Sequence, residues 1–139
     1  QGAAVSGLSA VERAVLDALR AYVGVRSALG VAPRVFAGDA EKPAYPYLEV
    51  SRNEVEDVSG ADALMWRHEL DLAVMTSVGG RDEAREAADA VRAVIDAGAL
   101  SIAGYRFVLA SAPFIDVVRA SVHLWRALVR VRLQVEPAP

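Results

Sequence analysis

A segment of strictly alternating character, Leu64–Thr76, constrains the fold of this chain more than any other part of its sequence. Its alternate positions form a mostly apolar set, Trp66, His68, Leu70, Leu72 and Val74, and a mostly polar set, Met65, Arg67, Glu69, Asp71 and Ala73. Successive side chains of a β-strand point to opposite faces of its sheet, so the pattern predicts a strand with one buried and one wetter face. Other elements of the chain must cover the buried face.

Two amphipathic helices are predicted to supply that cover. The first, Ser9–Tyr22, has an apolar stripe at helical spacing and opens with a capping box formed by Ser9 and Glu12. It is expected to end near Gly24, with one further turn at Val25–Leu29.

The second helix follows the break Val78–Arg81, with Asp82 as its expected cap and Gly98 as its C-terminal glycine. Its apolar stripe is rich in alanine, which lets it lie close to the sheet. Two ion pairs at i, i+4 spacing, Arg85–Asp89 and Arg92–Asp96, are expected on the helix.

Further strands are expected at Arg34–Phe36, Tyr47–Val55, Tyr105–Ala112 and Leu128–Glu136. Asn53–Ala63 is expected to form an acidic connection, and the strand from Tyr105 is expected to stop at Pro113. Val117–Ala127 has no clean period and is compatible with either a helix or a strand.

Short connections between successive strands favour hairpins and an antiparallel sheet. The expected fold is α+β and two-layered, with a mainly antiparallel four- to five-stranded sheet packed by two amphipathic helices. We expect one domain over residues 1–139, with flexible ends at 1–8 and 136–139.

Composition excludes several classes of function. The chain has no cysteine, which rules out disulfides, thiolate metal sites and cysteine nucleophiles. Its formal net charge of −3 argues against a sequence-independent nucleic-acid binder. No apolar run approaches the ~20 residues of a membrane-spanning helix, and Gln1–Gly7 lacks the cationic start of a signal peptide, so no membrane association is expected.

The glycine-dependent phosphate and nucleophile motifs are also missing from the sequence. The single lysine, Lys42, precedes Pro43, so no P-loop exists, and neither Gly-x-Gly nor Gly-x-Ser-x-Gly occurs. We therefore predict no catalytic, cofactor-binding or metal-binding site.

Two histidines, His68 and His123, are the remaining candidates for a general base. His68 shares the apolar face of its strand, while Glu69 and Asp71 point to the other face and cannot easily orient it. A hydrogen-bonded, inert histidine at the edge of the core is the favoured interpretation, and His123 beside Trp125 is interpreted in the same way. Two histidines without cysteine give only weak support for a zinc site, since three or four ligands must converge on the metal.

Two groups of charged residues remain. Glu54, Glu56, Asp57 and Asp62 lie together but lack the spacing of a calcium loop, so a solvated loop is favoured. Arg126, Arg130 and Arg132 share one face of the last strand, and they are expected to pair with Glu69 or Asp71, or with a neighbouring subunit.

Several local strings and the order of elements resemble the tail-terminator, or tail-completion, family of long-tailed phages and phage-derived gene-transfer agents. The matching strings are Pro33-Arg34-Val35-Phe36, Pro46-Tyr47-Leu48-Glu49-Val50, Arg67-His68-Glu69-Leu70-Asp71-Leu72, Asp82-Glu83-Ala84 with Val91 and Ile95, and the arginine-rich strand Arg126 to Val135. The resemblance extends over nearly the whole chain, and Pro46-Tyr47 is its sharpest element.

The resemblance implies a structural virion protein without enzymatic activity or cofactor. Such proteins form a ring, usually of six subunits, that caps the head-proximal end of the tail tube, stops its polymerisation and joins the tail to the neck. The implied partners are other copies of the chain, the tail tube protein and the head–tail connector or stopper protein, with DNA passing only transiently through the ring. The implied location is the virion, after assembly in the bacterial cytoplasm.

Two surfaces are predicted to serve this role. The acidic set Glu54, Glu56, Asp57 and Asp62 is expected to contact the tube or to line the bore. The subunit interface is expected to include Val117, Val118, Trp125, Arg126 and Arg130.

Three alternatives remain open at this stage. The protein could be a neck protein of the connector or stopper type. It could be a small α+β enzyme that uses His68 or His123 as its base. It could also be a binding module that pairs a sheet edge with a strand of its partner.

Overall fold

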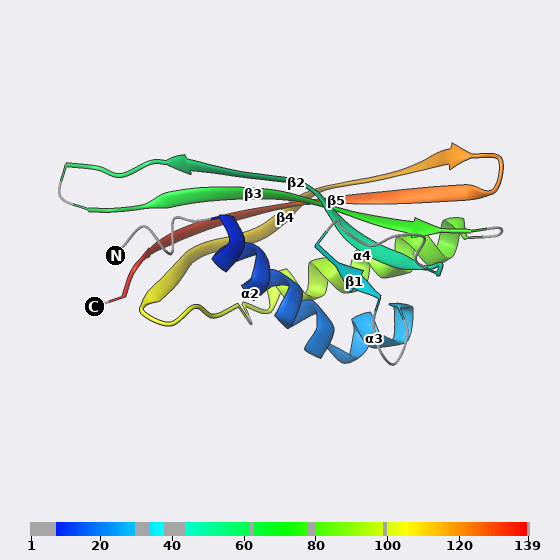
Figure 1. The fold of residues 1–139 in the computed structure, drawn as a ribbon, viewed down its shortest axis with the longest axis horizontal. Helices are drawn as coiled ribbons and strands as arrows, with labels where there is room; N and C mark the ends of the chain where they lie inside the picture. The colour runs from blue at the N-terminus through cyan, green and yellow to red at the C-terminus, as the bar shows by residue number, and fades with distance from the viewer. Residues whose placement is uncertain are drawn as a thin grey trace.

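The computed structural model describes residues 8–29, 34–37, 44–61, 63–77, 80–98 and 100–138. Its elements, in chain order, are α2 (Leu8–Ala21), α3 (Val23–Leu29), β1 (Val35–Phe36), β2 (Tyr47–Asp57), β3 (Trp66–Thr76), α4 (Arg81–Asp96), β4 (Tyr105–Ser121) and β5 (Leu124–Pro137). The sheet lies in one layer and the helices lie in a second layer on one of its faces (Figure 1). The predicted α+β, two-layer fold is confirmed.

The five strands lie in the order β1-β2-β3-β5-β4. The pairs β2–β3, β3–β5 and β5–β4 are antiparallel, whereas β1 pairs with β2 in parallel at Val35↔Leu48 and Phe36↔Glu49. The sheet is therefore mainly antiparallel, as expected. The strand β5 lies inside the sheet, between β3 and β4, although it comes last in the chain.

The core lies between the sheet and the helices. The alternation of β3 places Leu70, Leu72 and Val74 on the helix-facing side, each with no exposed surface. Helix α2 contributes Val11, Val15 and Leu19, and helix α4 contributes mainly small residues such as Ala84, Ala87 and Ala88. The small side chains of α4 allow a close approach to the sheet, as the alanine-rich stripe predicts.

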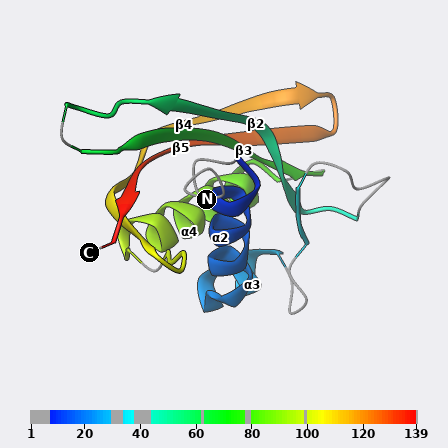
Figure 2. The same ribbon diagram turned by 60° about the vertical axis from the view of Figure 1, so that its left-hand side comes forward.

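Two long hairpins reach beyond the layer of helices in opposite directions (Figure 1). The β2–β3 hairpin extends to one end of the molecule and the β4–β5 hairpin extends to the other. The view turned by 60° shows the same layer of strands above the helices (Figure 2). No helix covers the opposite face of the sheet among the described residues, and we call that side the outer face.

Both hairpins are longer than the sequence predicts. Strand β2 continues to Asp57, so Glu54, Glu56 and Asp57 lie in a strand and not in a connection. Strand β4 continues through Pro113 to Ser121, and the undecided segment Val117–Ala127 forms the end of β4, the turn and the start of β5.

The expectation that β4 stops at Pro113 is wrong for a physical reason. The register between β4 and β5 shifts between Ser111 and Phe114, which places Pro113 in a bulge. Because β4 is also an edge strand, a residue without an N–H group is tolerated there.

The ends of the other elements also differ in detail. Gly80 is the N-cap residue of α4, and no side-chain hydrogen bond caps this helix, so Asp82 lies in the first turn and is not the cap. Gly98 ends α4 with a φ of 70°, as predicted. Strand β5 includes Glu136 and Pro137, so the sheet extends into the end that was expected to be flexible.

The expected local pairs on the helices are replaced by other contacts. Arg85 lies 3.5 Å from Asp82, and Nε of Arg92 donates to the carbonyl oxygen of Ala112 at 3.3 Å. Glu12 accepts a hydrogen bond from Nδ2 of Asn53 at 3.1 Å, which ties α2 to β2. The side chain of Ser9, the other half of the predicted capping box, lies outside the described part of the structure.

Candidate interaction surface

The outer face of the sheet carries a group of five charged side chains that we call the central ion-pair cluster: Arg52, Glu69, Asp71, Arg130 and Arg132. Asp71 accepts hydrogen bonds from Nε of Arg130 at 2.9 Å and from Nε of Arg52 at 3.1 Å. Glu69 accepts from Nε of Arg132 at 2.7 Å and also from Arg52. The predicted pairing of the β5 arginines with these two carboxylates is confirmed for Arg130 and Arg132 and is wrong for Arg126, which pairs with neither.

The strand registers create this cluster. Asp71 lies opposite Arg130 of β5 and Arg52 of β2, and Glu69 lies opposite Arg132. A bulge between Val50 and Arg52 shifts β2 by one residue and brings the guanidinium of Arg52 onto the outer face. The three strands are thereby tied together across β3.

The hydrogen bonds of the cluster favour the charged forms of Asp71, Glu69, Arg52 and Arg130. Burial raises the pKa of Asp71, but hydrogen bonds from Arg130 and Arg52 outweigh this effect, and the pKa lies below its usual value. Hydrogen bonds from Arg52 and Arg132 lower the pKa of Glu69. Hydrogen bonds to these carboxylates raise the pKa of Arg52 and of Arg130.

Apolar side chains of the edge strand β4 border the cluster. Phe114 and Leu109 are 44% and 42% exposed. The guanidinium carbon of Arg130 lies 5.1 Å from the centre of the Phe114 ring, within the range of a cation–π contact. The outer face therefore combines a charged centre with an apolar margin.

A groove of about 470 Å³ crosses the outer face toward the β2–β3 hairpin. It is lined by Glu54, Val55, Glu56, Arg67, Glu69, Leu109, Arg132 and Gln134. Its lining mixes carboxylates with guanidiniums, so it favours neither a strongly anionic nor a strongly cationic ligand.

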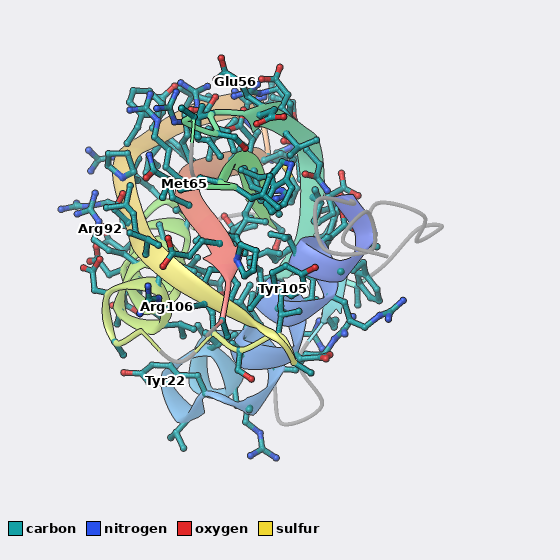
Figure 3. All side chains as sticks on the ribbon, turned by 90° about the vertical axis from the view of Figure 1, so that its left-hand side faces the viewer. Tyr22, Glu56, Met65, Arg92, Tyr105 and Arg106 are labelled. Atoms are coloured by element: carbon teal, nitrogen blue, oxygen red, sulfur yellow. The ribbon has the colours of Figure 1, made fainter. Side chains whose placement is uncertain are left out.

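The predicted acidic set lies along the β2–β3 hairpin. Glu54 is 2.6 Å from Arg52, and Glu56 is 3.2 Å from Arg67, both as ion pairs. Hydrogen bonds from the side chain and backbone of Ser59 lower the pKa of Asp57. Asp62, the fourth member of the set, lies outside the described residues. Glu56 lies on the side of the sheet away from Tyr22 and the helices (Figure 3).

The predicted subunit-interface residues divide between the two faces of the β4–β5 hairpin. The side chains of Val117 and Trp125 lie on the helix-facing side, where they pack against the core. Val118, Arg126 and Arg130 lie on the outer face. The structure therefore brings these five residues to one hairpin but not to one patch.

The ring of Trp125 contacts two arginines, and the sequence analysis did not predict these contacts. The guanidinium carbons of Arg119 and Arg81 lie 5.2 Å and 6.0 Å from its ring centre. Arg81 opens α4, so these contacts join the helix to the β4–β5 hairpin. Nε of Arg126 is buried, and no described residue hydrogen-bonds to it.

His68 is fully buried on the helix-facing side of β3, opposite Val55 and Leu133. The expected hydrogen bond is not formed, because neither ring nitrogen has a hydrogen-bond partner among the described residues. Burial lowers the pKa of His68 to about 4. A side chain in this position cannot contact a substrate. His123 lies in the exposed turn of the β4–β5 hairpin.

Within the ranges that the structure describes, no three histidine, aspartate or glutamate side chains are grouped so as to hold a metal ion. Over the same ranges, no helix is long and apolar enough to cross a membrane.

The described residues form a small α+β domain with an open sheet and a charged face that no described helix covers. Comparison with known families shows the class of protein. The model of the family described as tail completion protein gp17 matches residues 13–136. The chain belongs to this family and is a structural protein of phage tails.

Two solved structures share the fold. One is a chain of the virion of a native gene transfer agent particle, with 24% sequence identity, a TM-score of 0.79, and coverage of 92% of this chain and 96% of that chain. The other is the gp17 protein of bacteriophage SPP1, with 17% identity, a TM-score of 0.65, and coverage of 94% and 90%. No curated protein matches by sequence.

Proposed function

We propose that this protein forms a ring, with six subunits as the expected number, that caps the head-proximal end of a phage tail tube. The ring stops tube polymerisation and joins the tail to the head–tail connector or stopper protein. Its subunits assemble in the bacterial cytoplasm and remain in the virion. The family match over residues 13–136 is the observation that carries this proposal.

The charges of the outer face fit a surface past which DNA moves. Proteins retain DNA by neutralising its phosphates with lysine and arginine. In the central ion-pair cluster, Arg52, Arg130 and Arg132 are already paired with Glu69 and Asp71. A bore lined by this face would therefore contact DNA without holding it.

The β2–β3 hairpin is proposed as the contact with the tube or as part of the bore. It projects beyond the helices (Figure 1) and carries Glu54, Glu56 and Asp57, with Asp62 in its connection. An exposed projection can enter a neighbouring ring of subunits without moving the core of the domain.

The β4–β5 hairpin is proposed as a subunit contact. Because Val117 and Trp125 lie on one face and Val118, Arg126 and Arg130 on the other, a neighbouring subunit would contact this hairpin from its edge. Such a contact would not be a flat apolar patch. It would involve the strand β4, which lies at the edge of the sheet.

The mass of the assembly tests the proposal. We expect a closed cyclic oligomer, alone or after mixing with the tail tube protein, when mass is measured by analytical ultracentrifugation and shape by electron microscopy. In particles that lack this protein, tails should be over-long and unattached to heads. A strict monomer under both conditions, together with normal tails in its absence, would overturn the proposal.

A further inference from the structure

The β4–β5 hairpin ends in a turn that carries an exposed apolar side chain. Ser121 pairs with Leu124, so the turn consists of Val122 and His123 alone. Val122 is 76% exposed, the highest value of any large apolar side chain among the described residues. Two-residue hairpin turns favour glycine, asparagine and aspartate, so a valine here stabilises neither the turn nor the core of the domain. Its presence points to a contact outside the domain.

The surroundings of this turn are basic. Arg119 and Arg126 flank the turn in β4 and β5, and none of the guanidiniums of Arg119, Arg126 and Arg81 forms an ion pair with a described carboxylate. The exposed Arg119 rests its guanidinium on the ring of Trp125, 5.2 Å from the ring centre. The turn therefore presents an apolar side chain with an uncompensated positive charge beside it.

A hollow of about 430 Å³ lies where α4 ends and β4 begins. We call it the α4–β4 hollow, and its lining includes Ile95, Asp96, Leu100, Ile102, Tyr105 and Phe107. The apolar members of this lining belong to the core or pack against it. An apolar side chain that enters the hollow would therefore extend the core and leave water.

The charge at the α4–β4 hollow is opposite in sign to that of the turn. Asp96 is exposed and forms no ion pair with any residue that the structure describes. Arg106, which also lines the hollow, is paired with Glu136. The charge that remains uncompensated at the hollow is thus the carboxylate of Asp96, and opposite charges favour contact between the two surfaces.

The turn and the hollow cannot meet within one molecule. The hollow includes the first residues of β4, the turn follows the last residue, and the two lie at opposite ends of the molecule (Figure 1). The 17 residues of β4 separate them by roughly 50 Å, since a strand rises about 3.3 Å per residue. A contact between them requires a second copy of the chain.

We propose that the β4–β5 turn of one copy inserts Val122 into the α4–β4 hollow of the next copy, where Arg119 of the first copy faces Asp96 of the second. This inference rests on the proposed ring and names the two surfaces that build it. Each copy uses its turn on one neighbour and its hollow on the other, so the contact is heterologous. Heterologous contacts generate closed rings when the rotation between copies closes.

Site-specific cross-linking tests the contact, because the chain has no cysteine of its own. His123→Cys in the turn retains Val122, and Ser101→Cys lies at an exposed position of the hollow. The two variants are purified separately, mixed, assembled and treated with a short bismaleimide. We expect a covalent dimer in the mixture and little product from either variant alone. Val23→Cys in α3 (72% exposed), mixed with Ser101→Cys, is the matched control and should not cross-link.

The outcomes separate this inference from the ring itself. An assembled ring without the product of His123→Cys and Ser101→Cys would overturn the insertion and leave the ring intact. Efficient dimers of either variant alone would show that like surfaces meet, which also overturns the inference. An unmodified chain that stays monomeric with and without the tail tube protein would overturn the ring, and the insertion with it.

A second variant needs no cross-linker. Val122→Asn removes the apolar side chain and supplies a residue that suits a two-residue turn, so the melting temperature should not fall. The concentration needed for assembly should rise at least about tenfold. Val23→Asn is the control and should assemble like the unmodified chain. Unchanged assembly of Val122→Asn would contradict the proposal.

A charge exchange tests the pair of Arg119 and Asp96. Arg119→Asp and Asp96→Arg each bring like charges together, and each should weaken assembly. A chain with both substitutions has opposite charges again, and it should assemble at a lower concentration than either single variant. If the double variant assembles no better than the weaker single variant, the two residues do not face each other and the proposed contact is wrong.

Discussion

At the scale of single residues, Asp71 is the most constrained charge in the molecule. It is only 5% exposed, and it accepts hydrogen bonds from arginines of two different strands. Removing its carboxylate would leave Arg130 without an ion-pair partner among the described residues, whereas Arg52 would keep Glu69 and Glu54. The carboxylate is therefore more important for stability than the exposed ion pairs of the helices.

We predict that Asp71→Ala lowers the free energy of unfolding by about 2 kcal/mol, since breaking a largely buried pair leaves charges uncompensated. Urea denaturation measures this difference. Asp17→Ala removes an exposed partner of Arg20 at 3.5 Å and serves as the control, which should not change stability measurably. Equal effects of the two substitutions would contradict the role assigned to the cluster.

His68 makes stability depend on pH. Its pKa in the folded protein is about 4, below the ordinary value of 6.5, so the unfolded chain binds a proton more readily. The stabilisation is complete above the unfolded pKa and is lost as the pH falls from 6.5 toward 4.

We predict that the unmodified chain loses about 2 kcal/mol more stability than His68→Leu between pH 7 and pH 5. Denaturation curves at both pH values measure the difference. His68→Gln, which also cannot titrate, should behave like His68→Leu, and His123→Leu, in the exposed turn, should retain the dependence of the unmodified chain. Parallel pH dependence of all four proteins would show that His68 does not titrate in this range.

Residue patterns predicted the interior of the sheet well. The alternation of β3 placed His68 on the covered face and Glu69 and Asp71 on the outer face. The pairing of β5 arginines with these carboxylates was predicted correctly for Arg130 and Arg132 but not for Arg126. Arg52 was missed, because it reaches the outer face only through the bulge in β2. A bulge depends on pairing between distant strands, which no local pattern reports.

At the scale of elements, Gly80 at the start of α4 packs closely against the end of β3. A Cβ atom added to Gly80 would lie 2.4 Å from Oγ1 of Thr76 and 2.5 Å from the carbonyl oxygen of Ser77. The Thr76 hydroxyl also donates to the carbonyl oxygen of Gly80 at 2.8 Å. A glycine at this position allows this close approach of the helix to the strand.

We predict that Gly80→Ala lowers the free energy of unfolding by about 2 kcal/mol, because the contact is with backbone as well as with a buried side chain. Gly60→Ala, in the connection of the β2–β3 hairpin, has no atom within 4 Å of the added Cβ and should leave stability nearly unchanged. Thermal denaturation of both variants measures the effect. An unaltered melting temperature for Gly80→Ala would mean that the atoms around residue 80 accommodate the added methyl group without loss of stability. That outcome would contradict the prediction.

The lengths of the strands were the feature of the elements that the sequence predicted least well. Proline normally ends a strand in sequence-based reasoning, yet Pro113 lies inside β4, since an edge strand with a bulge tolerates it. The segment with Glu54, Glu56 and Asp57 was predicted to be a loop, because acidic residues are disfavoured in strands. Their partners Arg52 and Arg67, together with pairing to β3, stabilise them in β2.

At the scale of the whole molecule, the two projecting hairpins are the proposed sites of contact with other subunits and proteins. We predict that the combined change Glu54→Lys, Glu56→Lys and Asp57→Lys reduces assembly of complete particles, because it reverses the charge of the projecting β2–β3 hairpin. Electron microscopy of tail lengths and a count of tailed particles measure the effect.

The matched control is Glu83→Lys, Glu86→Lys and Asp89→Lys on the exposed side of α4, which changes the net charge by the same amount. Circular dichroism should show that both proteins are folded. Particles of normal number and tail length with the hairpin variant, or an equal defect with the helix variant, would contradict a specific role for the acidic hairpin.

The position of β5 inside the sheet, between β3 and β4, has a consequence for how the chain folds. Asp71 and Arg130, which join β3 to β5, are 59 residues apart in sequence. The contact order is therefore high for the middle of the sheet, which favours slow folding. During synthesis, β3 cannot gain its second neighbour until the strand made last has left the ribosome. A half-made chain would expose β3 to wrong partners, and a chaperone that shields it would raise the yield of subunits ready for assembly.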